Sequence, residues 1–166
     1  MAKLILNEGA GFEDFFAKLE QSADETLHEV LYVGAGVVAD EVRKSIESLP
    51  VDDEPWKHET GEDGRQLKRS TITSAQKAGL LDGLGIAPHK TDDGSMHTRI
   101  GFDGYNSHKT KNHPNGEPNA LVARSIESGT SFRQKTPFVR SAARRAKRPV
   151  IAAMEEKFNE IMKKEK

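Results

Sequence analysis

Residues 120–143 read ALVARSIESGTSFRQKTPFVRSAA, and three local signals follow one another within them. Residues 121–126 predict a short strand, and the Ser-Gly-Thr-Ser run at 128–131 predicts a tight turn. Thr136 and Pro137 predict a helix start, because the threonine hydroxyl can accept a hydrogen bond from an amide of the first turn and proline has no amide to leave unpaired. The stretch therefore predicts a strand, a turn and a helix in succession.

Two long amphipathic helices are expected on either side of the chain's centre. Over residues 12–49 apolar side chains recur at spacings of three and four, and Pro50 is expected to end that helix. Gly34 and Gly36 lie in its middle and each costs about 1 kcal/mol relative to alanine, so the helix either bends there or approaches another helix closely. The second helix runs from Pro137 to about residue 162, is kinked by Pro149, and has small residues in its first half that could pack against the glycines.

The middle of the chain predicts a β-hairpin between two polar loops. Residues 80–87 and 96–102 alternate apolar and polar side chains, and residues 91–95 have a turn composition. The loops span about residues 50–78, with a helical turn near residues 66–74, and residues 103–119. With the strand at 121–126 this gives three strands covered by two helices, an α+β fold with a small, mainly antiparallel sheet in one domain over residues 1–166.

Composition narrows the class of protein. The 166 residues are 35% hydrophobic, with a mean hydropathy of -0.68, so much of the surface is polar and some segments are expected to become ordered only on assembly. Cysteine is absent, which excludes disulfides and thiolate metal sites. The longest nearly apolar run, residues 30–39, is too short to span a bilayer and no signal peptide is recognisable. We expect a soluble protein made in the cytoplasm.

Charge is divided unevenly along the chain. Residues 1–63 hold 16 acidic and 5 basic side chains, a net charge of −11, whereas residues 64–166 hold 10 acidic and 20 basic ones, a net charge of +10. Such asymmetry suggests head-to-tail contact between copies, or binding of the basic half to an acidic surface or a nucleic acid. Neutralisation of the two halves within one fold is the alternative.

The densest positive charge lies in residues 133–148, which contain seven basic side chains and no acidic one. Arg140, Arg144 and Arg148 are spaced by four residues and share one helix face, with Arg145 beside them. Like charges four apart repel, so we expect compensation by protein acids, by phosphates or by solvent. These four arginines and Trp56, a loop anchor or a partner contact, are the candidate interface residues.

Histidines raise the question of a metal site. His108 and His113 lie in one loop near Asp103, but the sequence contains no HExxH motif and no helical pair of histidines spaced by four residues. A structural or surface role is favoured, and neither a cofactor nor a catalytic residue is expected. A metal-dependent hydrolase that uses this loop is kept as a rival hypothesis. The full set of histidines is His28, His58, His89, His97, His108 and His113.

The Ile-Glu-Ser-Gly-Thr run at 126–130, a polar spacer, the Thr-Pro-Phe-Val-Arg run at 136–140 and an alanine-rich basic helix form an ordered pattern. It resembles the C-terminal signature of the tail-completion or head-tail joining proteins of long-tailed bacteriophages, often labelled minor tail proteins. Residues 79–86, GLLDGLGI, resemble the strand entry of the same family, although Ala78 stands where the family often has threonine.

The resemblance implies a structural virion protein and not an enzyme. The family works as a ring at the head-tail interface, commonly of six copies, beside other connector and tail proteins, and genome DNA passes through the ring. The implied location is the virion, after assembly in the host cytoplasm. By this resemblance Glu127, Gly129 and Thr130 shape the turn, and Pro137 and Phe138 dock the last helix. The alternative is a nucleic-acid-binding module that uses the basic C-terminal helix.

Overall fold

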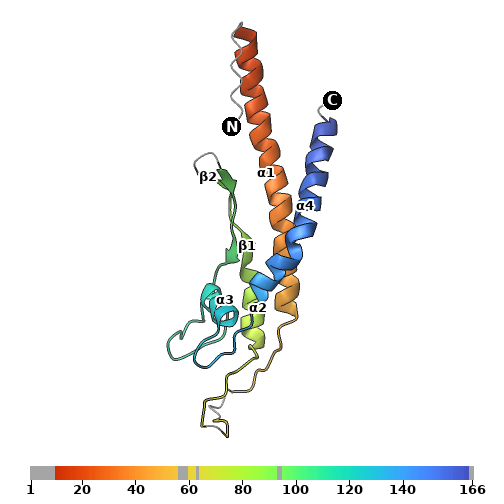
Figure 1. The fold of residues 1–166 in the computed structure, drawn as a ribbon. Coiled ribbons are helices and arrows are strands. Elements are labelled where there is room, and N and C mark those ends of the chain that lie inside the picture. Colours follow the sequence, from red (N-terminus) through yellow and green to blue (C-terminus); the bar gives the residue numbers. More distant parts are fainter. Residues whose placement is uncertain (1–9, 56–59, 63, 93–94, 165–166) are drawn as a thin grey trace.

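The computed structural model describes residues 10–55, 60–62, 64–92 and 95–164, with the backbone alone for residues 10–22, 95 and 164. In this part of the chain two helices are followed by four short strands, which form two antiparallel sheets, and then by two more helices (Figure 1). The α+β class predicted from the sequence is confirmed. In chain order the elements are α1 (Ala10–Glu47), α2 (Ser74–Gly83), β1 (Leu84–Ile86), β2 (Lys90–Asp92), β3 (Ser95–His97), β4 (Ile100–Phe102), α3 (Asn119–Ser128) and α4 (Phe138–Lys164).

Helices α1 and α4 lie side by side in opposite directions and form what we call the two-helix arm (Figure 1). Both long helices were predicted, and α4 continues through Pro149. A Cβ placed on Gly34 would lie 2.7 Å from Met154 Sδ, so the close approach is confirmed. Its partner is the second half of α4, however, and not the alanine-rich first half. Gly36 faces open space.

The core lies at the base of the two-helix arm, where α1, α2, α3 and α4 meet (Figure 1). Val42, Ile46, Ile72 and Leu80 are its largest fully buried side chains. Burial of a side chain of this size stabilises the fold by roughly 1.5–3 kcal/mol. The small Ala142 of α4 is also fully buried in this cluster, which lets α4 pack closely on the rest of the core.

The predicted hairpin is confirmed, as two successive strand pairs. Strand β1 pairs with β4 through Gly85 opposite Gly101, and β2 pairs with β3 through Thr91 opposite Met96. Residues 80–83, predicted as part of the first strand, belong instead to α2. The tip residues Asp93 and Gly94 of the predicted turn lie outside the described residues. The hairpin packs on α1, where the His89 amide donates to the Tyr32 hydroxyl at 3.1 Å.

Residues 121–126 form no strand, and that prediction is wrong. They belong to α3, in which Val122, Ala123 and Ile126 are buried. These spacings of one, three and four residues place the three side chains on one helical face. A six-residue segment with only four apolar side chains fits a short strand and a helix segment equally well, and here the helix covers the core in place of a third strand.

The helical turn predicted near residues 66–74 is also wrong. Gln66, Arg69 and Ile72 form isolated β-bridges, and α2 begins only at Ser74. Its start is fixed by a capping box: the Gln76 amide donates to Thr73 Oγ1 at 3.1 Å, and the Thr73 amide donates to Gln76 Oε1 at 3.2 Å. The two amides satisfied in this way make Ser74 the first helical residue.

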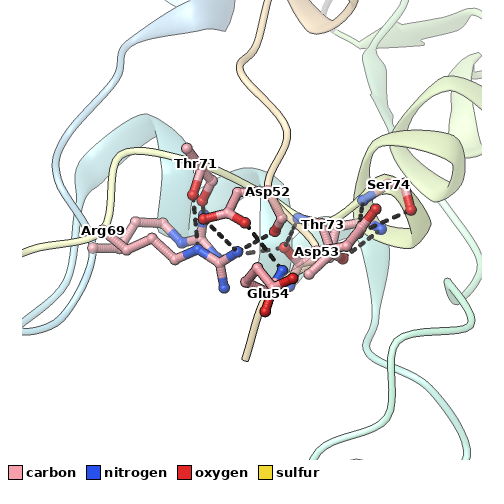
Figure 2. A network of polar contacts seen from close by, with 9 residues as sticks. Asp52, Asp53, Glu54, Arg69, Thr71, Thr73 and Ser74 are labelled. Carbon is pink, nitrogen blue, oxygen red and sulfur yellow. Dashed lines mark hydrogen bonds and ion pairs between the residues drawn. The ribbon is translucent and has the colours of Figure 1, made fainter. Parts of the chain in front are cut away.

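A polar network ties the two ends of the 50–73 loop together (Figure 2). Arg69 donates to Thr71 Oγ1 at 2.8 Å and to the carbonyl of Asp52. Asp53 accepts from the amide and the hydroxyl of Ser74 at 2.7 and 2.9 Å. The loop is therefore held against the start of α2, whereas Trp56 lies outside the described residues.

Candidate functional site

Residues 126–140 form one structural joint between α3 and α4. Gly129 ends α3 with a φ of 74°, and its amide donates to the Ser125 carbonyl at 3.0 Å. Thr130 closes the turn through its hydroxyl, which accepts from the Arg133 amide at 3.0 Å. A Cβ on Gly129 would lie 3.0 Å from the Lys135 backbone. Both the positive φ and the close approach favour glycine at this position.

The start of α4 is capped by Glu127 and not by Thr136, which corrects the sequence-based prediction. Glu127 Oε2 accepts from the Val139 amide at 2.9 Å, and Oε1 accepts from the Arg140 amide at 3.2 Å. The Arg140 side chain pairs with the same carboxylate at 3.0 Å. A carboxylate at a helix N-terminus satisfies free amides and complements the helix dipole. Glu127 therefore joins the end of α3 to the beginning of α4.

Phe138, but not Pro137, docks α4 on the core. The Phe138 side chain is buried, with its ring centroid 6.0 Å from that of Phe102 in β4. Pro137 is exposed just before the helix begins. The signature thus combines a turn, a helix cap and an aromatic anchor, all of which position α4.

The four candidate arginines of α4 fall into two pairs, one that forms ion pairs with acidic side chains among the described residues and one that does not. Arg140 pairs with Glu127, while Arg145 pairs with Glu41 of α1 at 3.2 Å and donates to Ser45 Oγ at 2.6 Å. The pKa of Glu41 is lowered by hydrogen bonds from Lys44 and Arg145. Acidic side chains of the same chain thus meet two of the arginines.

Arg144 and Arg148 are exposed, and within the described ranges neither forms an ion pair or hydrogen bond. Lys147 lies beside them and is exposed as well. These three side chains form what we call the basic patch, at the base of the two-helix arm. The basic patch leaves positive charge available to an external partner.

Arg133, the first residue of the basic run at 133–148, is buried, at 8% exposed. Its guanidinium donates to the Thr71 carbonyl at 2.9 Å and to Gln76 Oε1 at 3.5 Å. The net effect of its surroundings is to lower the pKa of Arg133: burial and the nearby Arg69 lower it, and Glu117 opposes them only in part. Its place in a run of basic residues gave no signal of its burial.

The polar loop at 103–119 holds more buried structure than its composition suggested. Asn106 and Asn119 are buried and bonded to each other at 3.3 Å, and Asn119 also donates to the Asp103 carbonyl at 2.7 Å. Gly79 and Gly83 of α2 lie against this pair of asparagines. Residues 79–83 of the GLLDGLGI run therefore serve as a packing surface for the loop.

A cavity of about 650 Å³ opens between α2, α3 and the loops around them. His108 and His113 line it, together with Arg69, Arg133 and Glu117. Over the described ranges, no three His, Cys, Asp or Glu side chains are grouped so that they could hold a metal ion. No helix in the same ranges is long and apolar enough to cross a membrane.

Comparison with protein-family models, with curated proteins and with solved structures gives no match for this chain. The observations that bear on its function are therefore its own sequence pattern and geometry. Of the candidate residues, Glu127, Gly129, Thr130 and Phe138 meet in one joint, and Arg144 and Arg148 share the basic patch.

Proposed function

We propose that this chain is a structural protein of a tailed-bacteriophage virion, which completes the tail or joins it to the head as part of a ring. The observation that carries the proposal is the signature at residues 126–140. Its motif residues have definite structural tasks here: Glu127 caps α4, Gly129 makes the turn, and Phe138 anchors the helix. A pattern whose residues act together in one joint is a better basis for resemblance than scattered identities.

The surface of the two-helix arm also supports an assembling protein. Leu27 of α1 and Ile151, Phe158 and Met162 of α4 are large apolar side chains between 42 and 51% exposed. Ile151, Phe158 and Met162 are spaced by seven and four residues and so share one face of α4, and an exposed apolar face is typical of a protein contact. A ring of identical subunits is built from such heterologous contacts, each between two different faces of the protein.

The distribution of charge along the two-helix arm suggests how neighbouring subunits are oriented in the proposed contact. The basic patch lies at the base of the arm, while Asp24 and Glu25 are exposed toward the far end of α1. Complementary patches at separate places on one chain favour head-to-tail packing of neighbours, and they steer association more than they strengthen it. Connector and tail proteins with acidic surfaces are the other partners that the basic patch would suit.

Gene deletion in the phage that encodes the chain tests this proposal. Electron microscopy of lysates should reveal filled heads apart from tails, and a plasmid copy should restore joined, infectious particles. Normal infectious particles from the deletion strain would refute the structural role.

A paired substitution then tests the basic patch. Arg144→Glu with Arg148→Glu should fail to complement the deletion while the protein stays folded. The matched control is Lys109→Glu with Lys111→Glu, which changes the charge equally on the exposed 105–118 loop and should complement. Salt-sensitive DNA affinity that falls in the arginine variant, with assembly intact, would instead favour a nucleic-acid-binding module.

A further inference from the structure

The cavity between α2, α3 and the loops has the dimensions of a ligand site. Its volume of about 650 Å³ lies within the range of roughly 300–1,000 Å³ typical of such sites. Its walls come from five separate segments: the 50–73 loop, α2, the 105–118 loop, α3 and residues 130–133. Side chains far apart in the sequence are thus gathered around one space.

Arg133 lies in the wall of this cavity with much of its donor capacity unused. A guanidinium carries five N–H donors, and acceptors among the described residues take one from each terminal nitrogen, through Thr71 and Gln76. Arg133 Nε is buried and has no acceptor in the described structure. Both acceptors that Arg133 does have are neutral, so a buried positive charge stands without an ion-pair partner among these residues. Such a charge costs stability unless an anion meets it.

The neighbouring charges leave the positive charge of Arg133 only partly offset. Arg69, a second guanidinium, lines the same cavity, and its own contacts are with Thr71 and Asp52. Glu117 is the acid that favours the charged form of Arg133. Its Oε2 accepts from Gln76 Nε2 at 2.6 Å, however, which directs this carboxylate toward the glutamine. Asp53 and Glu54 line the cavity as well, and Asp53 accepts from the amide and the hydroxyl of Ser74. The two guanidiniums therefore share the cavity with carboxylates, of which Glu117 and Asp53 are already hydrogen-bonded.

Apolar side chains stand beside these cations. Leu121 and Val122 of α3 line the cavity together with Phe132, and Leu121 and Phe132 remain 47 and 44% exposed. A partner that covered these two side chains would remove apolar surface from water while its charged end reached the arginines. This combination selects for an acid that is attached to an apolar group.

We propose that this cavity binds a carboxylate carried on an apolar group, with the carboxylate directed to Arg133 and Arg69 and the apolar part against Leu121 and Phe132. Two sources share this chemistry: a free organic acid, or an acidic side chain next to an apolar one on a partner protein. The inference does not rest on the proposed virion role, since it concerns a cavity separate from the basic patch.

Nuclear magnetic resonance of the ¹⁵N-labelled full chain provides the test. Two probes are titrated: 4-methylpentanoate, for a free acid, and the capped peptide N-acetyl-Leu-Glu-Leu-amide, for a protein segment. Each has a neutral control of the same shape, 4-methylpentanamide or the peptide with Gln in place of Glu. We expect the acid to shift the Arg133 Nε–H signal and the Leu121 and Phe132 amides, with an affinity at least about ten-fold above that of its neutral control.

The two probes separate the sources. Preference for the peptide assigns the cavity to a partner segment, and preference for the free acid assigns it to a metabolite-sized ligand. Equal binding of acid and neutral control, stronger binding of inorganic phosphate than of either acid, or no shift up to roughly tens of millimolar would overturn the proposal.

Three variants distinguish a loss of binding from a loss of folding. Arg133→Lys keeps the charge but removes the fork of donors and should weaken acid binding about ten-fold. Because Arg133 is buried and that variant can misfold, the exposed Leu121→Gln is the second variant, which should keep the wild-type spectrum and weaken binding of both acids. Arg144→Gln, on the basic patch, should leave binding unchanged. Unaltered affinity in a folded Leu121→Gln would refute the apolar half of the site.

Discussion

Replacing Glu127 by alanine should destabilise the protein through the start of α4. The carboxylate accepts from two backbone amides of the first turn, at 2.9 and 3.2 Å, and its side chain is only 14% exposed. The loss of a helix cap costs about 1 kcal/mol, and the second amide left without its acceptor adds a similar amount. The pair with the largely exposed Arg140 side chain adds little, about 0–0.5 kcal/mol. Glu127→Ala should therefore lower the free energy of unfolding by about 2 kcal/mol.

Urea unfolding followed by far-UV circular dichroism measures this change, and the melting temperature should fall by roughly 4–8 °C. Glu127→Gln should lose less, about 1 kcal/mol, since its amide oxygen can still accept one bond. Glu155→Ala, an exposed acid of α4 without a hydrogen bond to another described residue, is the matched control and should be neutral. If Glu127→Ala is no less stable than Glu155→Ala, the cap does not hold α4 as described.

Four further substitutions test local structure. Gly129→Val should cost at least about 2 kcal/mol, because its φ of 74° and the adjacent backbone both exclude a β-branched side chain; wild-type melting would contradict the turn. Gly36→Ala should stabilise the protein by about 0.5–1 kcal/mol, because a Cβ there meets open space. Gly79→Ala should destabilise it by about 1–3 kcal/mol, because the added Cβ would collide with the buried Asn106 and Asn119. Thermal melts in which Gly79→Ala is the more stable of the two would refute this packing. The pKa of Asp53 is lowered from 3.8 by hydrogen bonds from Ser74. The stability that ionised Asp53 contributes to the fold is complete above its unfolded pKa and is lost as pH falls through the lower folded pKa. Asp53→Ala should therefore be less stable than wild type at neutral pH and closer to it near pH 2 in urea titrations. A difference in stability that persists in acid would count against the hydrogen bonds from Ser74.

The two long helices could be predicted because their apolar period repeats over many turns, so single misplaced residues do not hide it. The hairpin was recognised from its turn composition between two short alternating runs. The first residues of its expected strand, 80–83, were assigned wrongly because α2 passes directly into β1 without a loop, and apolar side chains continue across the junction.

Helix α2 itself carried a local signal that was missed. Thr73-Ser74-Ala75-Gln76 fits the capping-box pattern, and the structure has both of its hydrogen bonds. For α3 no equivalent signal exists, since Pro118 gives no side-chain cap. A six-residue segment with four apolar side chains is too short to distinguish a strand from a helix.

Tertiary contacts explain the remaining differences at the candidate site. Glu127 caps a helix that starts eleven residues later, which no local rule at Thr136 would reveal. Arg133 is buried because α2 and the 50–73 loop pack over it, although its neighbours in the sequence are exposed. In both cases the sequence supplied the residue type, and the partner came from another part of the fold.

Electron microscopy of purified virions labelled with gold-conjugated antibodies against this chain tests the central claim most directly. The proposed role predicts gold particles at the joint between head and tail, and none on the separate heads and tails from the deletion strain. Label confined to the head shell or the tail tip, or infectious virions that lack the protein altogether, would contradict it.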